Sequence, residues 1–377
     1  MDKMDKSKWE YKKLGEVCEV LDKFRKPVTK SDRVAGQYPY YGATGIQDYV
    51  ADYIFDGRYL LLGEDGAKWG ANENSAFIIE GKSWVNNHAH ILKIDDSFMD
   101  IFVMYYLNHK DLSEYITGAV VPKLTQAAML KIPVPNISIA DQQRIVAELD
   151  CLNEMIALKQ EQLKEFDKLA QSIFYDMFGD PITNEKGWKI KKLEHVCQKI
   201  TDGTHNSPVN TEEGEYMYVT AKNIKKDGII LDDITYVSAE VHKVIYARCN
   251  PQYGDVLYIK DGVTTGIATI NTIKEEFSLL SSVALLKPGN DIVNYYLKAV
   301  LNTPSLYVSI RKNMGGAAIT RLTITKINSI DIPLPPLALQ QQFAEKIQAI
   351  EAQKELVKQS IAETQHLFDS RMDYYFN

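Results

Sequence analysis

The chain has 377 residues, of which 45% are hydrophobic and 25% are charged. This length exceeds the size at which one hydrophobic core usually stops growing, so we expect two globular units of ordinary composition. The start of the chain is polar, and no apolar run is long enough to cross a membrane, which argues against a membrane protein and favours the cytoplasm.

The net charge of −7 is unevenly distributed. Residues 139–180 carry 4 basic and 9 acidic side chains, whereas residues 181–331 carry 18 basic and 16 acidic ones. A nucleic acid would repel the acidic segment, so we expect it to face protein or solvent while basic patches elsewhere meet phosphate.

The four cysteines, at positions 18, 151, 197 and 249, include no CxxC pair, so they predict neither a zinc site nor a disulfide framework.

Residues 1–135 form the first predicted module. Short β-rich runs at 57–66 and 88–94, and a helical pattern at 100–110, indicate a mixed α/β module rich in strands. It closes with the IPVP stretch at 132–135. Because the residue before a proline favours extended geometry, a helix should begin only after this stretch.

Residues 136–180 predict a long helix. Apolar side chains recur in steps of three and four, with one polar interruption at Lys159, which is the heptad pattern of a packed helix seam. The seam contains Leu149, Leu152, Ile156 and Leu163.

The second module, 181–333, and a second helix, 334–377, repeat this organisation. Strand-like runs at 214–224 and 254–262 precede an IPLP stretch at 332–335. The second seam has polar interruptions at Lys354 and Thr364 and contains Ile347, Ile350, Val357 and Ile361. Each helix should be a rod of roughly 50–60 Å. Such seams can join separate chains, but two equivalent rods can also pair antiparallel within one chain and give it pseudo-twofold symmetry.

The two halves are copies of each other. The pattern W-x-x-K-K-L-x-x-V-C begins at Trp9 and again at Trp188, and Leu61-x-x-x-Asp65-Gly66 returns as Leu257-x-x-x-Asp261-Gly262. The matches keep their order along the chain, and their offsets drift as loops of different length require. This ordered duplication predicts two related modules, each followed by a helix.

The sequence offers little catalytic chemistry. It lacks a GxxxxGK[ST] loop for nucleotide phosphates. Asn250-Pro251-Gln252-Tyr253 looks like the NPPY tetrapeptide of adenine-N6 methyltransferases, but its third residue departs from that pattern and it runs straight into a predicted turn and strand. His88 and His90 could in principle share a metal, yet the other histidines are scattered. We therefore expect no catalytic residues and no metal site.

The chain resembles the specificity subunit of type I restriction-modification systems along essentially its whole length. The likeness rests on the duplicated W-x-x-K-K-L-x-x-V openings, on the IPxP stretches that lead into Gln142 and Gln340, and on the turns at 202–205 and 254–257. The resemblance implies two target recognition domains, about 1–135 and 181–333, each reading half of a bipartite asymmetric DNA site. It implies that the helices 136–180 and 334–377 pair antiparallel, set the gap and dock two modification subunits, which restriction subunits then join.

The resemblance also implies that S-adenosylmethionine, Mg²⁺ and ATP belong to the partner subunits, so this chain should bind double-stranded DNA and no cofactor. By analogy with dimeric readers, the half-sites should lie about 10 bp apart, centre to centre. Side-chain chemistry then suggests DNA contacts, with amides suited to adenine and cations to guanine or phosphate. The candidates are Tyr41, Lys68, Asn86, Asn87, His88 and Lys123 in the first module, and His205, Asn206, Lys222, Asn223, Lys260, Thr264 and Arg321 in the second.

Two other interpretations remain open. A self-contained DNA methyltransferase would use the tetrapeptide at 250–253 and would transfer methyl groups without partners. A coiled-coil scaffold that binds no nucleic acid would give no signal with any duplex.

Overall fold

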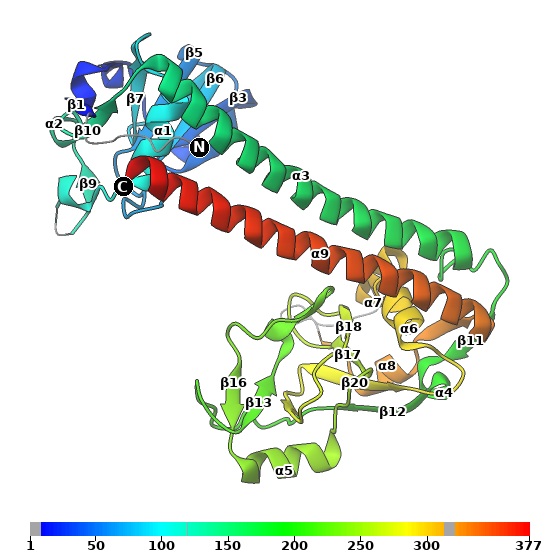
Figure 1. The fold of residues 1–377 in the computed structure, drawn as a ribbon. Helices are drawn as coiled ribbons and strands as arrows, with labels where there is room; N and C mark the ends of the chain where they lie inside the picture. Colours follow the sequence, from blue (N-terminus) through cyan, green and yellow to red (C-terminus); the bar gives the residue numbers. More distant parts are fainter. Residues whose placement is uncertain (1–8, 119, 313–320) are drawn as a thin grey trace. The chain divides into compact units, whose positions relative to one another are not determined.

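The structure is a computed structural model that describes residues 9–118, 120–312 and 321–377. The chain divides into two compact units (Figure 1). Unit 1 comprises residues 1–160 and 358–377, and unit 2 comprises residues 161–357. Each unit contains one copy of the repeat together with part of both long helices, so the helices do not form a separate domain.

Unit 1 is built on a six-stranded sheet. Its strands, in spatial order, are β2 (Cys18–Val20), β7 (Ala89–Ile94), β5 (Phe55–Gly63), β6 (Ala76–Val85), β3 (Ala35–Gly42) and β4 (Gly45–Val50). Neighbouring strands are antiparallel except for the pair β3–β6. Side chains alternate between the two faces of β5: Leu60 and Leu62 share a core with α1 (Asp100–His109), whereas Leu61 belongs to a core on the other face.

Unit 2 repeats the first four positions of this sheet. Its strands, in spatial order, are β12 (Cys197–Asp202), β20 (Val283–Pro288), β17 (Val256–Ile259) and β18 (Ala268–Ile270). Here Tyr258 shares a core with α6 (Asn294–Leu301), while Leu257 packs on the opposite face. A second, three-stranded sheet has the order β16 (Thr235–Val237), β13 (Tyr216–Val219) and β19 (Ser278–Leu279).

Short elements complete the two units. In unit 1 they are η2 (Leu14–Glu16), η3 (Asp22–Phe24), η4 (Lys30–Asp32), η5 (Ser113–Tyr115), β8 (Ile116–Thr117), β9 (Lys123–Leu124) and α2 (Gln126–Met129). In unit 2 they are α4 (Leu193–Val196), η6 (Ala221–Asn223), β14 (Ile224–Lys225), β15 (Gly228–Ile229), α5 (Ala239–Arg248), α7 (Pro304–Lys312) and α8 (Ile324–Asn328).

The duplicated motifs pair with each other inside each unit. β1 (Glu10–Lys13), from the W-x-x-K-K-L opening, pairs antiparallel with β10 (Pro133–Asn136), from the IPVP stretch. β11 (Lys189–Lys192) pairs in the same way with β21 (Asp331–Leu334). The two sequence signatures of each copy are therefore the two strands of one small ribbon that leads into a long helix.

The long helices are α3 (Ile139–Phe178) and α9 (Leu337–Phe376), with 40 residues each. A buried glutamine in the first turns anchors each one. The side chain of Gln142 accepts a hydrogen bond from the Met99 amide at 2.8 Å and donates to the Ile137 carbonyl at 3.0 Å. Gln340 accepts from Val293 at 2.9 Å and donates to Pro335 at 2.9 Å.

The helices pair antiparallel within each unit. In unit 1, Lys159 of α3 donates to the Thr364 hydroxyl of α9 at 2.7 Å. In unit 2, Asp167 of α3 accepts from Lys354 of α9 at 2.6 Å. Of the predicted seam residues, Leu149, Leu152, Ile156, Ile347 and Ile350 are buried, and Leu163, Val357 and Ile361 are half-buried. The polar residues of the seam form hydrogen bonds or ion pairs from one helix to the other. A shift of one helix along the other would break these contacts and lower stability.

In the part of the chain that the structure describes, no helix is both long enough and apolar enough to cross a bilayer.

Candidate nucleic-acid interface

The candidate interface lies where the repeated Asp-Gly turn follows a central strand. In unit 1, β5 runs into Glu64, whose carbonyl accepts a hydrogen bond from the Leu124 amide at 2.8 Å. In unit 2, β17 runs into Lys260, whose carbonyl accepts from Leu322 at the same distance. The two copies therefore hold the same backbone geometry with oppositely charged side chains at its centre.

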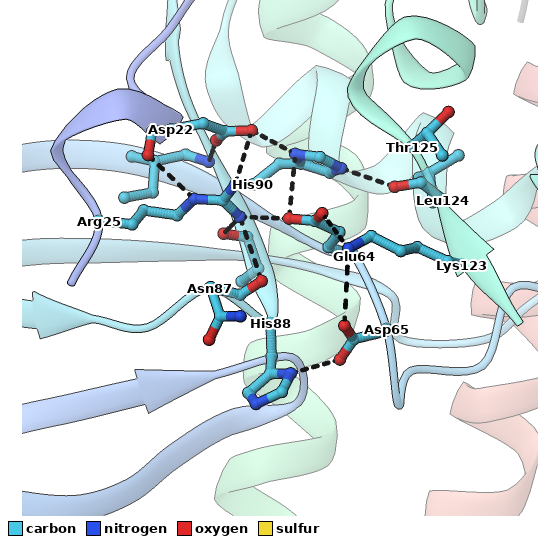
Figure 2. A network of polar contacts seen from close by, with 12 residues as sticks. Asp22, Arg25, Glu64, Asp65, Asn87, His88, His90, Lys123, Leu124 and Thr125 are labelled. Carbon is cyan, nitrogen blue, oxygen red and sulfur yellow. Dashed lines mark hydrogen bonds and ion pairs between the residues drawn. The ribbon is translucent and has the colours of Figure 1, made fainter. Parts of the chain in front are cut away.

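The unit 1 turn is surrounded by an ionic network (Figure 2). The Arg25 guanidinium pairs with Glu64, lies 3.2 Å from Asp22 and donates to the Ala89 carbonyl at 2.8 Å. The buried His90 ring has its Nδ1 2.5 Å from Asp22, and its Nε2 lies 2.7 Å from the Leu124 carbonyl.

The carboxylate of Glu64 is the electrostatic centre of this network. Burial alone would raise its pKa, but hydrogen bonds from Lys123, at 2.7 Å, and from Arg25 outweigh burial and hold the pKa below its ordinary value. Glu64 therefore stays ionised between its cationic neighbours.

Asp22, Glu64 and His90 could in principle hold a metal, because their ligand atoms lie within 4.8 Å of one another. Arg25 already bridges the two carboxylates, and both ring nitrogens of His90 face acceptors in the protein. The donor set therefore fits a charge-balanced structural cluster better than a cation site. His88 pairs with Asp65 instead, so the two imidazoles hold different carboxylates (Figure 2).

The segment 86–88, between β6 and β7, is held by hydrogen bonds and by an ion pair to this network. The side chain of Asn86 accepts from the His88 amide at 2.8 Å, and the His88 carbonyl accepts from Glu64 at 2.8 Å. The His88 imidazole pairs with Asp65. The side chains of Asn87 and His88 are exposed, so the network presents two polar groups on a fixed backbone.

Unit 2 carries a network at the equivalent turn whose central side chain has the opposite charge. The Lys260 ammonium lies 3.4 Å from Asp202 and 3.1 Å from Asp261. Arg248 also pairs with Asp202, and the exposed His205 ring lies 3.3 Å from the same carboxylate. On the far side, Arg321 lies 3.1 Å from Asp261.

Three predicted base contacts need correction. Asn86, Asn223 and Lys260 are only 2–3% exposed. Asn86 donates to Gln47 at 3.2 Å, and Asn223 accepts from the Thr220 amide at 3.0 Å and donates to the Ile230 carbonyl at 3.1 Å. Their polar groups satisfy the protein's own backbone and side chains, so we assign them to positioning the loops instead.

The other candidates remain predictions, and their accessibility differs. Tyr41 and Lys123 are half-buried, and the exposed ones are Lys68, Asn87, His88, His205, Asn206, Lys222, Thr264 and Arg321. The networks gather Asn87, His88 and Lys123 in unit 1 and His205 and Arg321 in unit 2. Lys68 lies apart from them and pairs with Glu73 at 3.6 Å.

Sequence reasoning missed the supporting residues Asp22, Arg25, Glu64 and Arg248. Asp22 and Arg25 are only three residues apart, but their hydrogen bonds to Ile91 and Glu64, and that of Arg248 to Asp202, join residues 39 to 69 apart. Local spacing therefore does not predict these clusters. One feature of the sequence does point to the networks: the residue before the repeated Asp-Gly is charged in both copies, with Glu64 in one and Lys260 in the other. The tetrapeptide at 250–253 leads into a turn at 253–254, and the Gln252 amide donates to the Asp255 carboxylate at 2.8 Å.

Comparison with known proteins decides the family. The model of the type I restriction modification DNA specificity domain matches twice, at residues 6–167 and 185–366. The chain belongs to this family.

Relatives extend the likeness over nearly the whole chain. A Haemophilus influenzae protein named "putative type I restriction enzyme specificity subunit" is 25% identical, over 99% of this chain and 95% of its own length. The fold is similar to that of a type I S subunit from M. genitalium, with a TM-score of 0.57 and 12% identity over 98% of this chain and 96% of that one. A chain from a structure describing assembly of the type I system also has a TM-score of 0.57, at 18% identity over 98% and 97%.

Proposed function

We propose that this chain is the DNA-specificity subunit of a type I restriction-modification complex, and that each unit reads one half of a bipartite asymmetric site on double-stranded DNA. The observation that carries the proposal is the duplicated turn, which has the same backbone in both units and different exposed side chains around it. Two copies of one backbone that carry different exposed polar side chains are suited to the recognition of two different half-sites.

In unit 1, the proposed readers are Asn87 and His88. An asparagine amide can make a bidentate contact to adenine, and an imidazole can donate to or accept from a base edge. Each good base contact discriminates by about 1–3 kcal/mol. Their fixed backbone favours specificity because little conformational entropy is lost on binding. His205 and Asn206 occupy the corresponding role in unit 2, while Lys123 and Arg321 meet phosphate.

The antiparallel helices α3 and α9 would set the gap between the half-sites, about 10 bp centre to centre. Linking two weak readers in one chain raises their joint affinity without any new contact. We further propose that the chain itself is non-catalytic and holds no cofactor. It would work in the cytoplasm, with two modification subunits that bind S-adenosylmethionine and with restriction subunits that use Mg²⁺ and ATP.

Reconstitution tests this proposal. The chain is purified alone and in complex with methyltransferase subunits from the same cells, and each sample receives labelled S-adenosylmethionine and DNA. The proposal predicts methyl transfer only by the complex. Transfer by the isolated chain would support the methyltransferase alternative, and a complex that binds every duplex equally poorly would support the scaffold alternative.

A further inference from the structure

Lys354 of α9 is a buried cation at the centre of a network in unit 2. Its side chain is only 5% exposed. The ammonium lies 2.6 Å from Asp167 of α3, 3.2 Å from Asp227 and 4.0 Å from Glu351 one turn earlier in α9. Asp227 belongs to the two-residue turn between β14 and β15, in the second recognition module. One side chain therefore joins both long helices to this module.

The network continues into a fourth element, because Glu351 lies 3.6 Å from Lys298 of α6. A cavity of about 370 Å³ lies among these elements, and Asp167, Asp227 and Glu351 all line it. Beside this cavity, the Lys354 ammonium holds carboxylates from α3, from the hairpin turn and from α9. Burial would lower the pKa of Lys354, but Asp167 and the neighbouring carboxylates raise it above its ordinary value, so the ammonium stays charged.

Unit 1 has no charge at the equivalent position among its described residues. The offset of 198 that relates Gln142 to Gln340 places Ile156 where Lys354 stands and Gln365 where Asp167 stands. The module is instead joined to α3 by neutral and singly charged hydrogen bonds. The Tyr105 hydroxyl donates to Asp150 at 2.6 Å and accepts from Asn153 at 2.9 Å. The buried ammonium is thus a feature of unit 2 and not of the shared scaffold.

We propose that Lys354 is a positioning residue that holds the second recognition module at a fixed angle to the helix pair and thereby sharpens the choice of gap length in the DNA site. The effect on gap length rests on the proposed function; the effect on the angle does not. The buried ammonium is compensated by Asp167 and Glu351 from the helices and by Asp227 from the module, so a rotation of the module that removes Asp227 weakens that compensation.

Distance measurements between spin labels test the angle without DNA. The labels are attached at Lys243→Cys on α5 and Ala352→Cys on α9, both exposed positions of unit 2, in a full-length chain carrying Cys151→Ser. The test variants are Lys354→Met and Asp227→Asn; the latter changes a side chain that is 59% exposed and should fold normally. The matched control is Lys346→Met, an exposed lysine on the same helix.

The inference predicts a distance distribution about twofold wider in both test variants and unchanged in the control. Distributions as narrow as that of the unmodified protein in Asp227→Asn would overturn it.

A second readout uses the complex with its modification subunits, titrated with duplexes that carry the native gap or one base pair more or less. We expect Asp227→Asn to lower the preference for the native gap at least about threefold, because the second module then samples more orientations. An unchanged preference would contradict the link to gap length. If the unmodified complex showed no sequence preference at all, the proposed function would fail, and the label distances would still decide the role of Lys354.

Discussion

The two units place opposite charges at the same point of one scaffold. In unit 1 the central side chain is Glu64, held by Arg25 and Lys123; in unit 2 it is Lys260, held by carboxylates. The strand, the turn and the backbone hydrogen bond beneath them are the same. Either sign of charge is therefore accommodated at this turn, because side chains of opposite charge surround it in each unit. The exposed side chains around the turn can then differ between the two copies while the turn itself is held in the same way.

Exchanging the two central charges should have the largest effect. Glu64→Lys would place an ammonium beside Arg25 and Lys123, and Lys260→Glu would place a carboxylate beside Asp202 and Asp261. Each change should lower the free energy of unfolding by about 3–5 kcal/mol, because buried like charges are left uncompensated. Urea unfolding of each single variant measures this, with Lys93→Glu on the exposed side of β7 as a control. If both exchanges were tolerated, the balanced clusters would not support the turns.

The glutamine anchors should give the next largest effect, and it should be the same in both units. Gln142→Ala and Gln340→Ala each remove a fully buried amide and leave backbone groups without their partner. Each should cost about 2 kcal/mol of stability. Gln143→Ala, at an exposed neighbour, should change stability little. A large effect in one unit alone would show that the anchors are not equivalent.

The pH dependence of stability should show a smaller effect, which arises from Glu64 in unit 1. The pKa of Glu64 lies below its ordinary value of 4.5, so the folded state binds a proton there less readily than the unfolded state. Its contribution to stability is therefore fully present above about pH 4.5 and is lost as the pH falls through the lowered pKa. We expect the stability difference between the unmodified protein and Glu64→Gln to shrink below pH 4.5, as measured by urea unfolding across pH. A difference independent of pH would contradict this role.

The smallest expected effect concerns phosphate. Lys123→Gln and Arg321→Gln should each reduce the slope of log affinity against log salt by about 1, without changing which sequence is preferred. Lys123→Gln should also weaken the support of the unit 1 turn, because it removes the ion pair to Glu64. Titrations of the assembled complex at several salt concentrations measure the slope. A change in sequence preference would assign these side chains to base contact instead.

The long helices and the duplicated modules could be predicted from sequence because they produce periodic or repeated patterns. The seam from Leu149 to Ile361 follows from heptad spacing, and the paired ribbons follow from motifs that occur twice. The helices were expected at 136–180 and 334–377 and run from 139 to 178 and from 337 to 376. Polar interruptions were visible too, although only the structure shows that Lys159 meets Thr364.

The networks could not be predicted in the same way. His90 and Asp22 are brought together by the pairing of two strands, β2 and β7, and no local pattern links them. The sequence predicts an exposed cation at Lys260 because this residue ends a strand next to a turn, but the side chain is buried and its ammonium pairs with Asp202 and Asp261. Whether a polar side chain at a turn faces DNA or the protein depends on tertiary neighbours that spacing does not encode.

A map of methylated adenines would show which unit reads which half of the site. Methylated adenines are mapped in cells that carry the complete system with the unmodified chain, with Asn87→Ala/His88→Ala, with His205→Ala/Asn206→Ala, or with His195→Ala, an exposed histidine of α4, as a control. The account predicts a bipartite site in which the first variant relaxes one half, the second relaxes the other half and the control relaxes neither. Variants that altered the same bases, or a site without two parts, would contradict the division of reading between the two units.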